Sequence, residues 1–179
     1  TLPFSSSTMP RAPCAAPPRS IEARADPAAP KARRANCRRA EAWRELGQSE
    51  LPGSAHNPRI VAMFDELGHP DQGDETAWCA AFVGACMERA GISSTRSLRA
   101  RSYLEWGVAT DNPAAGAIVV LARGSDPALG HVGFLVGATD THAFVLGGNQ
   151  SNAVTVAAFD RDLVLGFRTP QAQQAAQPS

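Results

Sequence analysis

The stretch from Trp78 to Met87 constrains this 179-residue chain most, because it contains no charged side chain. Its apolar residues recur at helical spacing, and Gly91 follows as a typical end of a helix. A helix that is apolar around most of its surface has to lie inside a protein. The rest of the chain is therefore expected to pack around this helix, with Cys79 in its first turn.

The hydrophobic pattern changes its period at Asn112-Pro113. Helical spacing precedes this point, and the predicted helices cover residues 40–46, 58–67, 78–90 and 98–106. Short apolar runs bounded by Gly, Asp, Asn and Pro follow it. The predicted strands cover residues 117–122, 131–137, 143–147, 153–159 and 164–168. Helices first and antiparallel strands second predict an α+β fold.

Composition sets the limits of the folded part. Residues 1–38 are rich in Pro, Ala and Arg and residues 171–179 are polar, so both are predicted to be disordered segments around one domain at residues 39–170. The formal net charge is zero, which gives no reason to expect nucleic-acid binding. The longest apolar runs fall far short of the roughly 20 residues that a membrane span needs, so we expect no membrane insertion. We also expect a monomer. Whether Cys14 and Cys37 pair stays open. Because this chain begins without Met, the sequence also leaves open whether the protein is exported.

Cys79 is the strongest candidate for a reactive side chain. Unpaired N–H groups and the dipole at a helix N-terminus favour a thiolate over a thiol. The same N–H groups can stabilise an oxyanion that forms on a substrate. A buried cysteine is more often structural, and this is the interpretation that we keep for Cys86 in the middle of the same helix. For Cys79 the decision depends on its partners.

Two later residues are candidate partners. Of the four histidines, His131 opens a predicted strand with glycines close on both sides, and Asn149 follows Gly147-Gly148 at the end of the next one. If these strands are adjacent and antiparallel, the two side chains meet at one end of the sheet. The Asn149 oxygen would then accept a hydrogen bond from the imidazole and fix its tautomer. Taken alone, each residue has an ordinary explanation, as a structural histidine and as a turn asparagine.

Four segments together resemble the NlpC/P60 and CHAP group of papain-like cysteine hydrolases, and especially a compact bacterial and phage subfamily with a C-terminal GGNQ motif. These segments are Trp78–Val83, Ala100–Gly107, Gly130–Phe134 and Leu146–Gln150. The resemblance covers most of the predicted domain and implies a papain-like fold, with helices packed on an antiparallel sheet of about five strands. The chain departs from the commonest NlpC/P60 pattern, Asp-Cys-Ser-Gly, by having Trp-Cys-Ala-Ala.

The resemblance implies peptidoglycan hydrolysis, at an amide bond in or next to the stem peptide. By position, Cys79 matches the nucleophile, His131 the general base and Asn149 the residue that orients the base. The backbone N–H of Cys79 is the one oxyanion-hole donor that can be assigned. Neither a metal nor an organic cofactor is required, and the expected site of action is the bacterial cell wall.

Five further residues are candidates for contact with the substrate. They are Trp78, Trp106, Asp74, Glu75 and Gln150. Core positions for the two tryptophans and a solvated loop for the acidic pair are equally compatible with the sequence. Two other functions stay open: a non-catalytic wall-binding or interaction module on the same scaffold, and a thiol acyltransferase with the same triad. The sequence distinguishes neither amidase from endopeptidase activity, nor wall remodelling from lysis or toxicity.

Overall fold

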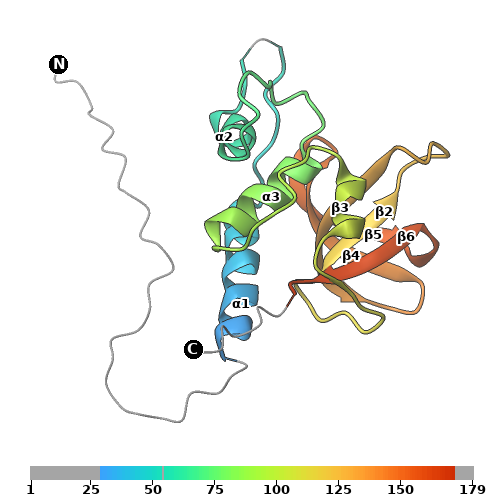
Figure 1. Ribbon diagram of the computed structural model, residues 1–179. Coiled ribbons are helices and arrows are strands. Elements are labelled where there is room, and N and C mark those ends of the chain that lie inside the picture. The colour runs from blue at the N-terminus through green and yellow to red at the C-terminus, as the bar shows by residue number, and fades with distance from the viewer. Residues whose placement is uncertain (1–28, 54, 172–179) are drawn as a thin grey trace, which may run out of the picture.

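The computed structural model describes residues 29–53 and 55–171, with side chains from residue 37 onward (Figure 1). The helices are α1 (Ala29–Arg44), α2 (Pro58–Glu66) and α3 (Cys79–Arg89), with two 3-10 helices, η1 (Ala100–Glu105) and η2 (Arg161–Leu163). The strands are β1 (Val108–Ala109), β2 (Ile118–Ala122), β3 (Gly130–Ala138), β4 (His142–Gln150), β5 (Ala153–Asp160) and β6 (Val164–Thr169). The predicted tails at residues 1–28 and 172–179 lie outside the described residues. Within the described part of the chain, no helix has the length and apolar character to cross a membrane.

Helix α3 lies at the centre of the molecule, between the other helices and the sheet (Figure 1). All of its residues from Cys79 to Met87 are buried. Phe82 packs edge-on against Phe134 of β3, with ring centroids 6.1 Å apart. This position explains why the stretch carries no charge, and the prediction of an internal helix is confirmed.

The start and the end of α2 follow local sequence signals. Asn57 caps the helix by accepting a hydrogen bond from the backbone N–H of Arg59 at 2.9 Å. Pro58 occupies the first turn, where its missing N–H is not needed. Gly68 follows the last turn with φ of 83°, a left-handed conformation that glycine adopts at little cost. The predicted helix is confirmed, with its end one residue earlier than expected.

Helix α1 is longer than the sequence prediction. It begins at Ala29 and therefore runs through residues that their composition assigns to a disordered segment. Ala, Lys and Arg are good helix formers, and Pro30 lies in the first turn, where proline is tolerated. Cys37 on this helix is disulfide-bonded, whereas Cys14, and with it the pairing that the sequence leaves open, lies outside the described residues.

Six strands form one antiparallel sheet in the order β1-β6-β2-β3-β4-β5. The predicted strands correspond to β2 through β6. The sequence did not predict β1, because this strand has two residues, both exposed, and so lacks the alternation that marks a strand. The α+β fold, with helices packed on an antiparallel sheet, is confirmed.

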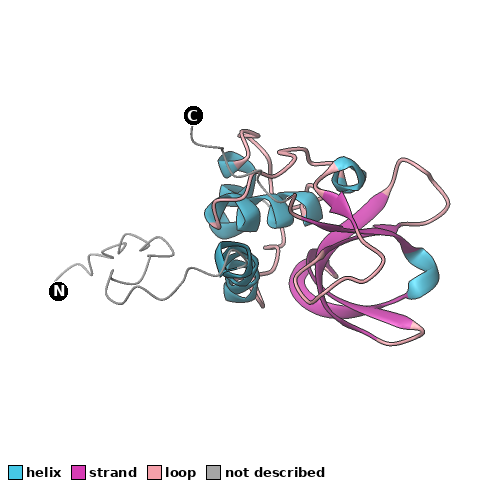
Figure 2. Cartoon of the chain, turned by 60° about the horizontal axis from the view of Figure 1, so that its bottom comes forward, coloured by secondary structure: helices cyan, strands magenta, loops and turns pink. Residues whose placement is uncertain are grey.

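The sheet is strongly curled (Figure 2). The short η2 helix connects β5 directly to β6, although β2, β3 and β4 separate the two in the sheet. The connection requires the sheet to bend until its two sides approach each other. The inner face then encloses a second apolar cluster, formed by Ala117, Val119, Leu121, Leu135, Ala143, Val145 and Phe167. Since β2 and much of β3 are buried on both faces, their sequences are nearly continuously apolar.

The segment that follows α1 covers part of the edge of β5. Gly47 donates a backbone hydrogen bond to Val154 at 2.9 Å, and Val154 donates one to Gln48 at 2.8 Å. Glu50 donates a third to Asn152 at 2.9 Å. The N-terminal helix is thereby joined to one of the last strands of the chain.

A buried carboxylate links the three α-helices. Glu45 directly follows α1, is fully buried, and pairs with Arg59 of α2 at 2.5 Å and with Arg89 of α3 at 2.8 Å. Arg89 also pairs with Glu66 at the end of α2, at 2.6 Å and closer to the surface. The helix layer is therefore held by one charged network around Glu45.

Candidate active site

Cys79 is the first residue of α3, and Trp78 occupies the cap position without a side-chain hydrogen bond to the helix. The thiol is 5% exposed. Burial raises the pKa of Cys79, and the backbone N–H groups of Val132 and Ala80 only partly offset this effect. The sulfur therefore lies beside the start of β3, and the free thiol carries its proton at neutral pH.

His131 is the second residue of β3 and is 8% exposed. Its ring stacks on Phe159, with centroids 5.4 Å apart. Its Nε2 lies 3.0 Å from Oε1 of Gln150. Burial lowers the pKa of His131, the hydrogen bond to Gln150 raises it in part, and the charge of Arg123 lowers it further. The imidazole is consequently neutral near pH 7 and able to accept a proton.

The surroundings of Gln150 decide which nitrogen of His131 carries the proton. Nε2 of Gln150 lies 2.7 Å from the carbonyl oxygen of Thr155 and 3.3 Å from that of Val145. Two carbonyl groups can only accept, so the amide must point its NH₂ group at them and its oxygen at the imidazole. Nε2 of His131 must then be the protonated nitrogen that donates to Gln150. Nδ1 keeps its lone pair.

Cys79 and His131 come together at the start of β3 without a direct bond. Among the described residues (29–53 and 55–171), the Cys79 sulfur makes no hydrogen bond to the His131 ring. The thiol lies against the N–H of Val132 instead. A thiol–imidazole contact of this kind commonly tightens only when the substrate binds. The arrangement provides a thiol, a neutral imidazole with a fixed tautomer, and the N–H groups of a helix N-terminus.

Asn149 does not make the expected contact with the imidazole, which Gln150 makes instead. The reason is an irregularity of the pairing between β4 and β5 that lies between Gly147 and Gln150. Asn149 adopts φ of 58° there, in the left-handed region that asparagine tolerates better than most residues. The bulge turns Gln150 toward His131, so the role that we assign to Asn149 is conformational.

The glycines of the GGNQ motif allow two close approaches. A Cβ on Gly147 would lie 2.7 Å from Oε1 of Gln150 and 3.0 Å from Nε2 of His131, and would therefore push these two side chains apart. A Cβ on Gly148 would lie 2.4 Å from the ring of Trp78. Gly148 thus lets the residue before Cys79 pack directly on β4, which sets the position of the thiol relative to the sheet.

We expect Gly148→Ala to destabilise the protein by about 1–3 kcal/mol, because the new methyl group has to displace the Trp78 ring and Phe82. Urea-induced unfolding measures this change. Gly137→Ala in β3 is the matched control, since no atom lies within 4 Å of its added Cβ and its φ is not left-handed. Equal free energies of unfolding for the two variants would contradict this account of the motif.

Four of the residues predicted to contact the substrate are held by contacts within the protein. Trp78 is fully buried and donates from Nε1 to Glu50 at 2.7 Å. Trp106 is half-buried and donates from Nε1 to the carbonyl oxygen of Ser93 at 2.9 Å. Gln150 binds His131, as described, and Asp74 is internal. Of the five, Glu75 is exposed and in a position to meet a ligand.

Asp74 joins two loops beneath the start of α3. It is fully buried and accepts hydrogen bonds from the backbone N–H groups of Leu51 and Asn57, both at 2.8 Å. Its other oxygen lies 2.9 Å from Nδ1 of His56. Burial alone would raise the pKa of Asp74, but these partners hold it below its usual value. Asp74 therefore acts as a structural carboxylate, and its burial leaves no exposed oxygen for the predicted contact with a substrate.

Sequence reasoning missed two features of the site, the contact of Gln150 with His131 and the charge of Arg123, which lowers the pKa of His131. The available signal for Gln150 was its place directly after Asn149, a residue type that tolerates the left-handed conformation. The available signal for Arg123 was its place directly after the strand that pairs with β3. No group of three or more His, Cys, Asp or Glu side chains among the described residues could hold a metal ion.

The sequence model of the CHAP domain family matches residues 71–149, a segment that contains Cys79, His131 and Asn149. No curated protein matches the chain. Similar solved structures include an NLP/P60 family protein, described as similar to a lipoprotein, from Staphylococcus aureus subsp. aureus Mu50. It is 13% identical over 78% of this chain and 42% of its own, with a TM-score of 0.46.

The P60 domain of an antigen from M. avium subspecies paratuberculosis is also similar, with 13% identity over 78% of this chain and 96% of that domain, and a TM-score of 0.49. The chain thus spans less than half of the first of these two structures. The family match covers both the helix that begins at Cys79 and the strand that carries His131. On this match, the chain contains a CHAP-like domain.

Proposed function

We propose that the CHAP-like domain hydrolyses an amide bond in or next to the stem peptide of peptidoglycan, with Cys79 as the nucleophile and His131 as the general base. The family match supports a peptidoglycan-related hydrolase. The observation that carries the mechanism is the fixed tautomer of His131, whose lone pair on Nδ1 is left for a thiol proton. In this proposal Gln150 takes the orienting role first assigned to Asn149.

The reaction begins with transfer of the thiol proton of Cys79 to Nδ1 of His131. The sulfur then attacks the carbonyl carbon of the scissile amide, and the oxyanion is stabilised by the N–H groups at the start of α3. The imidazolium returns its proton to the departing amine, which breaks the C–N bond and leaves a thioester on Cys79. Water, deprotonated by His131, hydrolyses the thioester and releases the carboxylic acid.

Digestion of purified peptidoglycan tests the proposal. The wild type should release peptide fragments that mass spectrometry can identify, whereas Cys79→Ala should release none, and Cys86→Ala should behave like the wild type once its folding has been verified. Intact wall with the wild type would exclude this substrate, and equal cleavage by Cys79→Ala would exclude this nucleophile. Products that form only with an added amine would favour an acyltransferase, and retention on the wall without cleavage would favour a binding module.

The two buried thiols should differ in their reaction with iodoacetamide. Cys79 is 5% exposed and has a base at hand, whereas Cys86 is fully buried and should react only on unfolding. Because burial raises the pKa of Cys79, its alkylation depends on His131, and His131→Ala should slow it about 10-fold or more. Peptide mapping by mass spectrometry measures both rates. An unchanged rate for Cys79 in His131→Ala would remove the base from the mechanism.

The acid limb of kcat/KM should lie below the ordinary histidine pKa of about 6.5. The active form of His131 is neutral, and because burial lowers the pKa of His131, this form persists to lower pH than in an exposed histidine. A pH profile with a peptidoglycan fragment measures the limb. A limb above about 6.5 would mean that the catalytic base is another group or that His131 is not buried in the active enzyme.

A further inference from the structure

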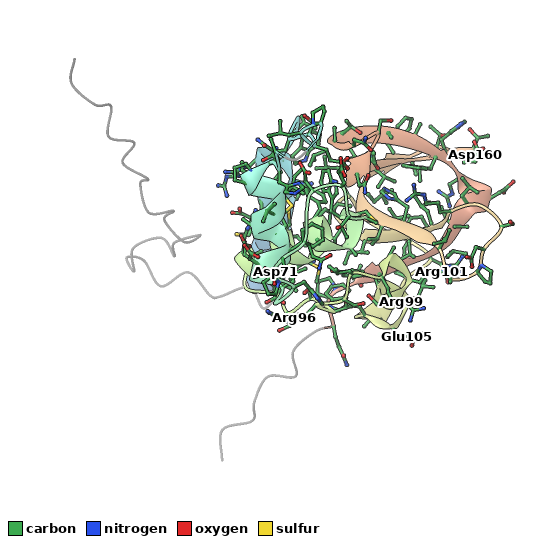
Figure 3. All side chains as sticks on the ribbon, turned by 90° about the horizontal axis from the view of Figure 1, so that it is seen from above. Asp71, Arg96, Arg99, Arg101, Glu105 and Asp160 are labelled. Carbon is green, nitrogen blue, oxygen red and sulfur yellow. The ribbon has the colours of Figure 1, made fainter. Side chains whose placement is uncertain are left out.

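The corner around Gly130 lies directly before His131. Gly130 pairs with Ala122 at the end of β2, and the preceding Leu129 accepts a hydrogen bond from Nε of Arg101 at 2.6 Å. A Cβ on Gly130 would lie 3.0 Å from Cγ of Arg101, so the arginine stem covers this corner. Arg101 lies on η1, near Glu105 of the same helix and Arg99 at its N-cap (Figure 3). It fixes the end of the loop that connects β2 to β3.

Arg123 stands at the beginning of that loop, directly after β2. Alternation along an extended strand places it on the same face as Leu121, which pairs with His131. Its charge lowers the pKa of both the Cys79 thiol and the His131 ring, so the guanidinium lies within electrostatic reach of the two reacting groups. Arg123 is exposed, and the ion pairs among the described residues include none to it.

An exposed arginine without a carboxylate partner is ordinarily solvated, but two facts distinguish Arg123. It belongs to a loop held at its far end by Arg101 and shaped by a hydrogen bond from Ala128 to Asp126 at 2.7 Å. It also follows by two residues Leu121, the strand partner of His131, and lies within electrostatic reach of the thiol and the imidazole. A guanidinium recognises carboxylates through two parallel hydrogen bonds, and its charge remains fixed over the working pH range.

We propose that Arg123 binds a carboxylate of the substrate beside the scissile amide, so that the enzyme prefers stem peptides with a free carboxylate at this position over the same peptides with a carboxamide. The inference rests on the proposed function and adds the charge of the preferred substrate. Amide cleavage itself needs no carboxylate. The preference is therefore a property of Arg123 and not of the reaction.

Two forms of one muropeptide test this inference. They differ only at the α-carboxyl group of the γ-linked glutamate in the stem peptide, which is free in one and amidated in the other. We expect wild-type kcat/KM to be about 10-fold or more higher for the free acid, and Arg123→Gln to bring the ratio close to 1. Arg123→Lys should retain part of the preference, because an ammonium group keeps the charge but not the bidentate geometry.

Arg99→Gln is the matched control, because Arg99 is an exposed arginine at the N-cap of η1 and its loss changes the net charge equally. Its ratio should equal that of the wild type. Equal rates of the wild type on both muropeptides, or a ratio that falls equally in Arg99→Gln and Arg123→Gln, would overturn the inference while the hydrolase proposal stands. Cleavage of neither muropeptide nor of whole peptidoglycan would overturn the proposed function itself.

Discussion

Gln150→Ala is expected to lower kcat about 10³-fold, although Gln150 takes no part in bond making or breaking. Without the amide oxygen, nothing holds the proton on Nε2 of His131, and the tautomer with the proton on Nδ1 cannot accept one from the thiol. Steady-state kinetics with a muropeptide measures the loss. Nitrogen-15 NMR of labelled histidine should show the Nε2–H form in the wild type and a mixture in the variant.

Two variants separate this positioning effect from general damage to the fold. Gln150→Glu keeps an acceptor for Nε2 and adds a negative charge, so it should retain much of kcat and move the acid limb of the pH profile upward. Thr155→Val removes only the bond from Gln150 to the Thr155 hydroxyl, of 3.0 Å, and should change kcat less than about 10-fold. If Gln150→Ala keeps both the wild-type tautomer and the wild-type kcat, Gln150 is not the orienting residue.

Glu45→Ala is expected to destabilise the protein by about 1–3 kcal/mol, the usual cost of leaving buried donors without their acceptor. The variant takes the carboxylate away from Arg89, whose side chain is 13% exposed, and from Arg59, whose side chain is 42% exposed. The loss stays moderate because Arg89 keeps its pair with Glu66 and solvent reaches Arg59. The midpoint of urea unfolding measures the change, and an unchanged m-value would show that the folded state kept its compactness.

Glu66→Ala provides the comparison for Glu45→Ala. Glu66 also pairs with Arg89, at 2.6 Å, but its side chain is 37% exposed. Solvent screens such a pair, so the loss should stay below about 1 kcal/mol. Similar losses from the two variants would show that burial of Glu45 does not decide the strength of the network.

The helix that begins at Cys79 and the strands could be predicted because burial leaves a mark on the sequence. A helix without charged residues and strands that are apolar on both faces have to lie in the interior of the protein. The supposed antiparallel pairing of the strand that begins at His131 with the next strand is also confirmed, as β3 and β4. These elements depend on patterns of several residues, which single substitutions disturb little.

The features that the sequence did not predict depend on single residues or on distant partners. Asn149 was chosen for its place after Gly147-Gly148 and by the resemblance, whereas the pairing irregularity between Gly147 and Gln150 brings Gln150 to the imidazole. Asp74 was expected at the surface. It is buried because it accepts hydrogen bonds from the N–H groups of Leu51 and Asn57, which lie 23 and 17 residues earlier in the chain. The length of α1 was missed because alanine and arginine suit both a linker and a helix.

The hydrogen bonds that join Gly47 and Gln48 to Val154 have a consequence for when the groups of the candidate site come together during synthesis. During synthesis Cys79 leaves the ribosome well before His131, and the acceptors that orient Gln150 leave last, at Thr155. Contacts over such separations form late in folding, because the long loops between them must close first. The thiol therefore has no oriented base until β5 has been made and has closed against the segment after α1. A nascent chain that stops before β5 therefore carries the Cys79 thiol without an oriented imidazole beside it.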